Sequence, residues 1–239
     1  TYAKLSARTI GNHDFDWGTE RLKALCETTN NDFYIPTLGA NIYNYKDGKM
    51  GNEQQEQFGK DYAVFTVENG LKIGVVGVIG DSELTSISSQ LVSDIAFSNQ
   101  NEKIKEVSDF LRVEKQCDIV IASIHDYASN NLGYGLTDIS KVSGKRYVDL
   151  VLNAHTHQKE TFTTNNVNFV QFGAYGQIIG KIKKIEEYSS YITLRVNNDL
   201  NPKKDVLIPF VKAYINEVNL DEEKIIIEDI DGLIWKSQY

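Results

Sequence analysis

Two apolar runs constrain the fold of this chain more than any other feature. Asp118–Ile124 is almost uninterrupted in its apolar character, and Val148–Ala154 repeats the pattern. Runs of this kind are typical of strands covered on both faces, as in the centre of a mainly parallel sheet. The first run ends at His125 and the second at His155. Ligands of such sheets bind where loops leave the strand ends. Both histidines therefore occupy positions where a ligand is expected.

The segments around these runs predict an α/β layered domain. Asn69-Gly70 is typical of a type I′ turn and separates two β-rich segments, which predicts a hairpin. Apolar residues recur at helical spacing in two further segments, each of which predicts a helix. The predicted helices are 17–29 and 99–116, the hairpin strands 62–68 and 71–79, the other strands 35–42 and 168–172, and the surface loop 45–59.

Beyond about Gly180 the pattern changes to β-rich, and no helix is evident. Lys181–Val196 and Tyr214–Asp229 are predicted hairpins, and Asp205–Val211 is a predicted strand. The sequence therefore predicts a small β-rich segment after the layered domain.

Composition narrows the function classes. The chain has 239 residues, of which 41% are hydrophobic, enough for a sizeable core. A net charge of -8 argues against non-specific affinity for nucleic acid. No apolar stretch is long enough to span a bilayer. Cys26 and Cys117 are interpreted as two separate buried thiols rather than a disulfide.

All four histidines fall in three short motifs at predicted strand ends, Gly11-Asn12-His13-Asp14, Ile124-His125-Asp126 and Ala154-His155-Thr156-His157. Imidazole is the commonest side-chain metal ligand and the usual acid or base near neutral pH. The clustering therefore suggests a catalytic metal centre. His125 alone also fits a structural role, and the His155/His157 pair also fits a polar turn.

The first motif contains more potential ligands than the others. The Asn12 amide oxygen is a possible metal ligand, and Asp16 is spaced to orient the His13 imidazole. Alternatively, Asp14 or Asp16 caps the helix that begins near Trp17. Both interpretations can hold together.

These motifs, in this order, resemble those of calcineurin-like metallophosphoesterases, and most closely the 5′-nucleotidase branch. The resemblance covers about residues 9–182 and includes Gly11-Asn12-His13-Asp14-Phe15-Asp16-Trp17-Gly18, Leu38-Gly39-Ala40-Asn41, Asn69–Gly77, the strand ending at His125, Ala154-His155-Thr156-His157, and Val170–Gly176 followed by Gly180.

The resemblance implies a layered β-sandwich flanked by helices and two divalent metal ions, such as Zn, Mn or Fe. Asn12, His125 and His155 would bind one ion, and His157 its neighbour. Asn12 and His13 would bind substrate, with His13 and Asp16 as the catalytic pair. Water activated by the two ions would hydrolyse nucleotide phosphomonoesters, with a cyclic-nucleotide phosphodiesterase as the alternative.

The family's opening Asp-x-His and Gly-Asp motifs are absent. By the resemblance they belong upstream of Thr1, so residues 1–181 are expected to be a metallophosphoesterase domain that is incomplete at its N-terminus. The His157 site would then lack most of its ligands. An inactive truncated or fused chain is therefore a further alternative.

Residues 182–239 resemble the closing strands of the PRC barrel of the ribosome maturation factor RimM, which implies a possible ribosomal partner. The alternative is a β-rich tail that completes the phosphoesterase sheet. Nucleotidases of this branch are usually exported, whereas a ribosome maturation factor works in the cytoplasm. The longer phosphoesterase match favours an extracytoplasmic or cell-surface location, with the cytoplasm as the alternative.

Overall fold

The computed structural model describes residues 5–27, 35–46, 49–50, 58–67, 70–127, 131, 134–175, 178, 180, 193–196, 206–209, 215–219 and 224–227. The chain divides into two compact units, Thr1–Ile179 and Gly180–Tyr239. In the described part, no helix has the length and apolar character that crossing a membrane requires.

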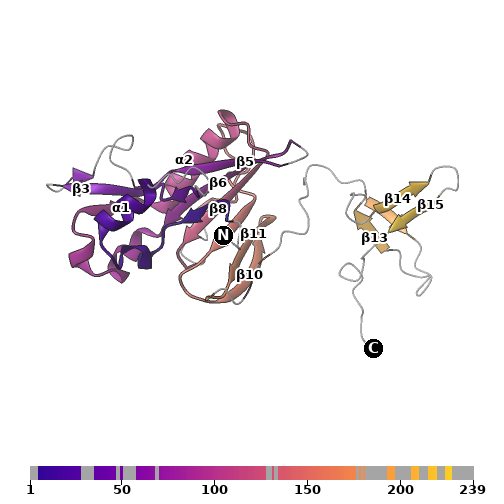
Figure 1. The fold of residues 1–239 in the computed structure, drawn as a ribbon. Coiled ribbons are helices and arrows are strands. Elements are labelled where there is room, and N and C mark those ends of the chain that lie inside the picture. The colour runs from indigo at the N-terminus through magenta and orange to yellow at the C-terminus, as the bar shows by residue number, and fades with distance from the viewer. Residues whose placement is uncertain are drawn as a thin grey trace. The chain divides into compact units, whose positions relative to one another are not determined.

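A mixed six-stranded sheet forms the centre of the first unit (Figure 1). Its order is β10-β11-β9-β8-β6-β5; the four inner strands are parallel, and β5 and β10 are antiparallel edges. The strands are β5 (Tyr62–Thr66), β6 (Lys72–Ile79), β8 (Ile119–His125), β9 (Leu150–Asn153), β10 (Lys159–Thr164) and β11 (Val167–Phe172).

Helix α2 (Gln100–Val113) covers one face of this sheet. The Asn99 side chain begins the helix by accepting hydrogen bonds from the amides of Asn101 and Glu102. One apolar stripe of the helix then packs on alternate residues of β6 and β8. The shared buried cluster includes Ile104, Val107, Leu111, Val76, Val78, Val120, Ala122 and Ile124.

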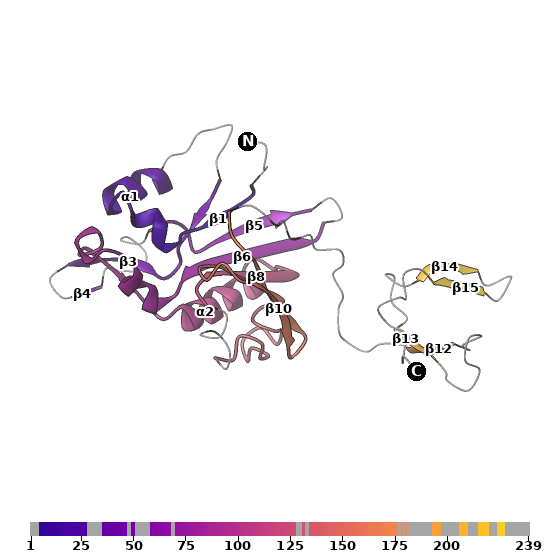
Figure 2. The same cartoon turned by 90° about the horizontal axis from the view of Figure 1, so that it is seen from below.

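The opposite face is covered by a parallel pair of short strands, β1 (Arg8–Thr9) and β2 (Thr37–Leu38). Gly77 permits this contact, because a Cβ atom there would lie 2.3 Å from Leu38 Cβ. Figure 2 shows β1 and α1 (Thr19–Glu27) on one side of the sheet and α2 on the other. The sheet is therefore the middle layer, and the predicted α/β layered fold is confirmed.

The remaining elements of this unit pack around a second buried cluster that includes Ile10, Phe15, Leu22, Phe58 and Ile79. They are β3 (Ile42–Lys46), β7 (Ile95–Phe97) and the 3-10 helices η1 (Asn12–Phe15), η2 (Asp81–Ser86) and η3 (Ser89–Leu91). β4 (Lys49–Met50) pairs with β3. β3 lies between β4 and β7 in a three-stranded sheet.

The alternation of β8 decides which side of the sheet receives its histidine. Ile124 belongs to the cluster under α2, whereas Ser123 hydroxyl lies 2.8 Å from Thr9 hydroxyl on the β1 side. Side chains alternate along a strand, so His125 shares the side of Ser123. This is also the side on which β1 continues into η1.

The predicted strand 35–42 is wrong as a single element, because the chain turns between β2 and β3. The buried Asn41 side chain accepts a hydrogen bond from the Ile79 amide at 3.0 Å and donates to the Ile79 carbonyl at 2.7 Å. These bonds fix the turn to the end of β6. The predicted loop 45–59 is also partly wrong, since Tyr45 pairs with Met50; residues 51–57 lie outside the described residues.

The second unit contains two antiparallel pairs. β12 (Thr193–Val196) pairs with β13 (Val206–Pro209), and β14 (Ile215–Asn219) with β15 (Lys224–Ile227). The predicted hairpin over 214–229 and strand over 205–211 are confirmed. For the predicted hairpin over 181–196, residues 181–192 lie outside the described residues, and residues 193–196 pair with β13 instead.

Cys26 and Cys117 are both free, as expected, but only Cys117 is buried, whereas Cys26 is partly exposed. Burial raises the pKa of the Cys26 thiol to about 11, and burial also raises the pKa of Cys117. Both thiols therefore stay protonated near neutral pH, which fits a packing role.

Asn41→Ala is expected to lower the free energy of unfolding by about 2 to 4 kcal/mol, because it leaves the Ile79 amide and carbonyl buried without their side-chain partner. Urea denaturation of the full chain measures the loss. Asn168→Ala is the matched control, since Asn168 makes an exposed contact with Thr163. A loss no larger than that of the control would contradict the anchoring role of Asn41.

Candidate metal centre

Three side-chain donor atoms converge beyond the ends of β8 and β9. Asn12 Oδ1 lies 2.8 Å from His125 Nε2, and His155 Nδ1 lies 3.3 Å from the same nitrogen. Ligands that share an ion at about 2.1 Å lie roughly 3 to 3.4 Å from one another, and the two distances here are within or close to that range. The donor set therefore fits a divalent cation, and it unites three of the residues that the sequence predicted.

The glycine of the first motif allows this approach. A Cβ atom on Gly11 would lie 2.7 Å from the His125 ring, so a larger residue would displace the imidazole. Burial, and then the neighbouring His155, lower the pKa of His125 to about 4. His125 is consequently neutral near pH 7, with a lone pair available to a metal.

Asp14 closes the loop that presents Asn12. Its carboxylate accepts a hydrogen bond from the Gly11 amide at 2.9 Å and lies 3.1 Å from the Arg8 guanidinium. Asp14 thus caps the start of η1, whereas the sequence had predicted Asp14 or Asp16 as a cap of the helix that begins near Trp17. Asp16 instead lies 3.0 Å from His13 Nδ1, and both side chains are exposed.

The His155-Thr156-His157 segment adopts an unusual backbone. His155 has φ of 74° and His157 has φ of 59°, in the left-handed region that is uncommon for residues other than glycine. Buried Gln171 supports the segment by donating to the Thr156 hydroxyl at 2.7 Å and to the Gln158 carbonyl at 3.2 Å. Such strain is typical of functional sites.

His157 lies apart from the three converging donors. It is exposed, and its ring packs edge-on against Tyr175 with the centroids 5.3 Å apart. Within the described ranges, no three His, Cys, Asp or Glu residues form a group that could hold a metal. The convergent set instead consists of an amide and two histidines, while the second metal position predicted for His157 stays a prediction.

Sequence analysis missed Glu83, a buried residue of η2 whose carboxylate lies 3.2 Å from His155 Nε2. Ile79, the last residue of β6, pairs with His125, so the loop after β6 emerges beside the site. The sequence feature that could have indicated Glu83 is its position as an acidic residue shortly after a buried strand. Asp126, by contrast, is directed away into a buried contact with Gln100 at 3.0 Å.

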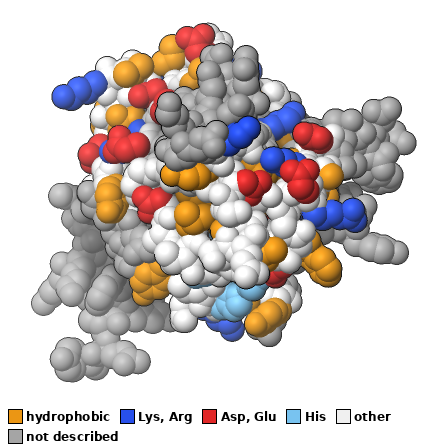
Figure 3. All heavy atoms as spheres, turned by 90° about the vertical axis from the view of Figure 1, so that its left-hand side faces the viewer, with side chains coloured by type: hydrophobic (Ala, Val, Ile, Leu, Met, Phe, Trp, Pro, Cys, Tyr) orange, Lys and Arg blue, Asp and Glu red, His pale blue; other side chains and the backbone are white. Residues whose placement is uncertain are grey.

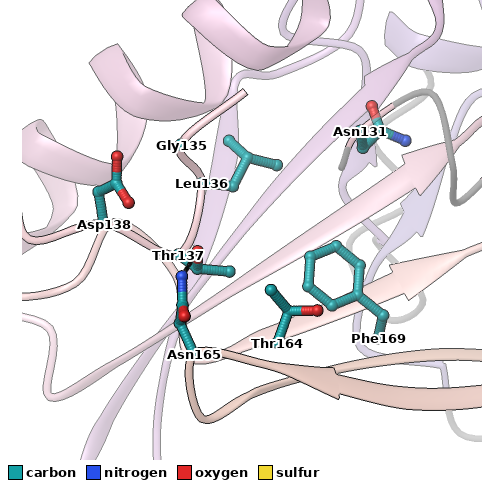
Figure 4. Close-up of a pocket in the computed structure, with 8 residues that line it drawn as sticks. All are labelled: Asn131, Gly135, Leu136, Thr137, Asp138, Thr164, Asn165 and Phe169. Carbon is teal, nitrogen blue, oxygen red and sulfur yellow. Dashed lines mark hydrogen bonds between the residues drawn. The ribbon is translucent and has the colours of Figure 1, made fainter. Parts of the chain in front are cut away.

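On the outer surface, histidine side chain atoms are accessible beside a hydrophobic side chain (Figure 3). A separate pocket lies on the α2 side of the sheet (Figure 4), since its residues Leu136 and Phe169 belong to the cluster under α2. Its other lining residues are Asn131, Gly135, Thr137, Asp138, Thr164 and Asn165. This pocket is therefore on the opposite face from His125.

The fold of the first unit is that of calcineurin-like phosphoesterases. The solved calcineurin-like phosphoesterase YfkN from Bacillus subtilis superposes with a TM-score of 0.51 at 18% identity, over 72% of this chain and 55% of that one. At this identity the likeness shows the fold alone.

The sequence resembles 5′-nucleotidases, as its motifs indicated. Protein UshA of Yersinia enterocolitica is 27% identical over 165 residues, covering 67% of this chain and 28% of that protein. A 5′-nucleotidase of Vibrio cholerae is 27% identical over 157 residues, covering 64% and 26%. The chain thus spans about a quarter of the length of these relatives.

The RimM PRC barrel domain matches residues 165–233, which confirms the second resemblance. The match begins before β11, which pairs with β10 over six residue pairs and with β9 over three. This strand pairing assigns β11 to the phosphoesterase sheet, so the first part of the matched segment is structurally part of the first unit.

Asp14 and Asp16 are expected to affect different properties. Asp14→Ala removes the cap and the Arg8 contact, and should lower the free energy of unfolding by about 1 to 2 kcal/mol. Asp16→Ala, at an exposed site, should change it by less than about 0.5 kcal/mol. Thermal or urea denaturation of the two variants measures both values, and equal losses would contradict this assignment.

Proposed function

We propose that this chain is a metal-dependent phosphohydrolase of the 5′-nucleotidase type that acts on nucleotide phosphomonoesters. The convergence of Asn12, His125 and His155 carries the proposal. The phosphoesterase fold and the 5′-nucleotidase relatives support it.

Two divalent ions, when bound, would supply an activated water nucleophile and neutralise charge on the phosphate oxygens. Asn12, His125 and His155 would hold one ion, and His157 would contribute to the other. The remaining ligands of the second ion are not evident among the described residues. Zn, Mn and Fe all suit a donor set of imidazole and amide.

His13 and Asp16 are assigned to the substrate. His13 Nδ1 faces the Asp16 carboxylate, which would orient the ring. The other nitrogen, Nε2, would then donate a hydrogen bond to a phosphate oxygen or to the leaving oxygen. Asn12 would contact the substrate as well as the ion, because it adjoins His13 in η1.

We also propose a division into a phosphoesterase domain over 1–181 and a β-rich domain over 182–239. An extracytoplasmic location follows from the proposed nucleotidase class. The ribosomal partner stays a prediction, because the RimM match concerns the barrel alone.

Metal removal should abolish phosphate release from nucleoside 5′-monophosphates, and added Mn²⁺, Co²⁺ or Zn²⁺ should restore it.

His13→Ala should lower kcat by about 10²- to 10⁴-fold, because it removes a proton donor near the reacting phosphate. It should leave metal affinity unchanged, since the His13 side chain is 79% exposed and is not among the three converging donors.

Lys145→Ala is the control, because it removes an exposed positive charge outside the site. Cyclic nucleotides and phosphodiesters are assayed in parallel, and faster cleavage of these would favour the phosphodiesterase alternative. A full chain that neither binds a divalent ion nor releases phosphate would contradict the proposal.

A further inference from the structure

The carboxylate of Glu83 is buried beside the candidate metal centre and has no role in the function proposed above. Glu83 is 7% exposed and lies in η2, directly after β6. A buried carboxylate is costly unless hydrogen bonds or an opposite charge compensate for the lost water. Its partners therefore indicate its role.

Among the described residues, two side chains contact the Glu83 carboxylate, and both contact the same oxygen. Oε2 lies 3.2 Å from His155 Nε2 and accepts a hydrogen bond from the Ser86 hydroxyl at 2.7 Å. The other nitrogen of His155, Nδ1, faces His125 Nε2 at 3.3 Å. The two ring nitrogens point in different directions, so the carboxylate and the converging donors lie on different sides of the His155 ring.

This arrangement separates two roles for the His155 nitrogens. A metal ligand needs an unprotonated nitrogen, and the neutral imidazole then carries its proton on the other one. A carboxylate at the protonated nitrogen fixes both the tautomer and the ring orientation of a metal-binding histidine.

We propose that Glu83 is a positioning residue that accepts a hydrogen bond from Nε2–H of His155 and so directs the Nδ1 lone pair towards the metal ion. Ser86 supports it by holding the same carboxylate oxygen. The assignment of a metal to this site rests on the proposed function, whereas the tautomer that Glu83 imposes on His155 does not.

The first test uses the metal-free full chain with ¹⁵N-labelled histidine, at mildly alkaline pH where imidazoles are neutral. Long-range ¹H–¹⁵N correlation is expected to show His155 protonated at Nε2. Glu83→Ala should shift the population towards the Nδ1–H form, whereas Glu83→Gln should largely retain the native tautomer, because its amide oxygen can still accept the bond. An unchanged tautomer in Glu83→Ala would overturn the inference.

The second test is metal affinity, measured by Co²⁺ or Zn²⁺ titration. Glu83→Ala should weaken binding by about 10- to 100-fold. Ser86→Ala should weaken it less, and this variant keeps the test informative should Glu83→Ala fail to fold. Asp81→Asn is the matched control, since Asp81 is an exposed carboxylate of the same helix that contacts Asn99.

The two experiments separate the inference from the proposed function. A wild-type chain that binds no divalent ion contradicts the metal site, while a shifted His155 tautomer in Glu83→Ala still supports the role of Glu83. If the wild type binds metal and Glu83→Ala binds it equally well, the positioning role is wrong and the proposed function is unaffected.

Discussion

The parallel pairing of β6 with β8 is the constraint on which the rest of the site depends. The pairing runs in register from Ile73 with Ile119 to Ile79 with His125. It brings the loop after β6, with Glu83, beside the histidine that ends β8. Asn41 is bonded to the last residue of β6, so the turn before β3 is fixed to the same strand end. The paired strands thus fix the positions of the strand ends and loops that carry the residues of the candidate site.

The lowered pKa of His125 favours the convergence of the three donors. Near neutral pH the His125 ring is uncharged, so Asn12 and His155 approach an imidazole that carries no positive charge. Glu83 stands outside this group, behind His155. The three donors can therefore bind a cation through their lone pairs, although none of them is a carboxylate.

Much of this arrangement could be predicted from the sequence. The apolar runs before His125 and His155 predicted central strands, and the position of both histidines directly after these runs predicted that they lie at strand ends. β10 was missed because Phe162 is the single apolar residue among its Lys, Glu and Thr residues, too few to mark it as a strand. Strand 35–42 was wrong because the hydrogen bonds of Asn41 override the local β tendency.

Other features depend on contacts between residues far apart in the sequence. Glu83 lies 72 residues before His155, and only the β6–β8–β9 order brings them together. The motif alone did not show that the Asp14 carboxylate binds the Gly11 amide and Arg8, since Arg8 lies outside the motif. The left-handed backbone of His155 and His157 was likewise not predictable from their spacing.

X-ray absorption of the full chain loaded with one equivalent of Zn²⁺ tests the central claim most directly. If Asn12, His125 and His155 form the site, the spectrum will show outer-shell scattering from two imidazole rings together with oxygen ligands, and the imidazole contribution will fall in His155→Ala. A first shell of oxygen atoms without imidazole scattering would contradict the account.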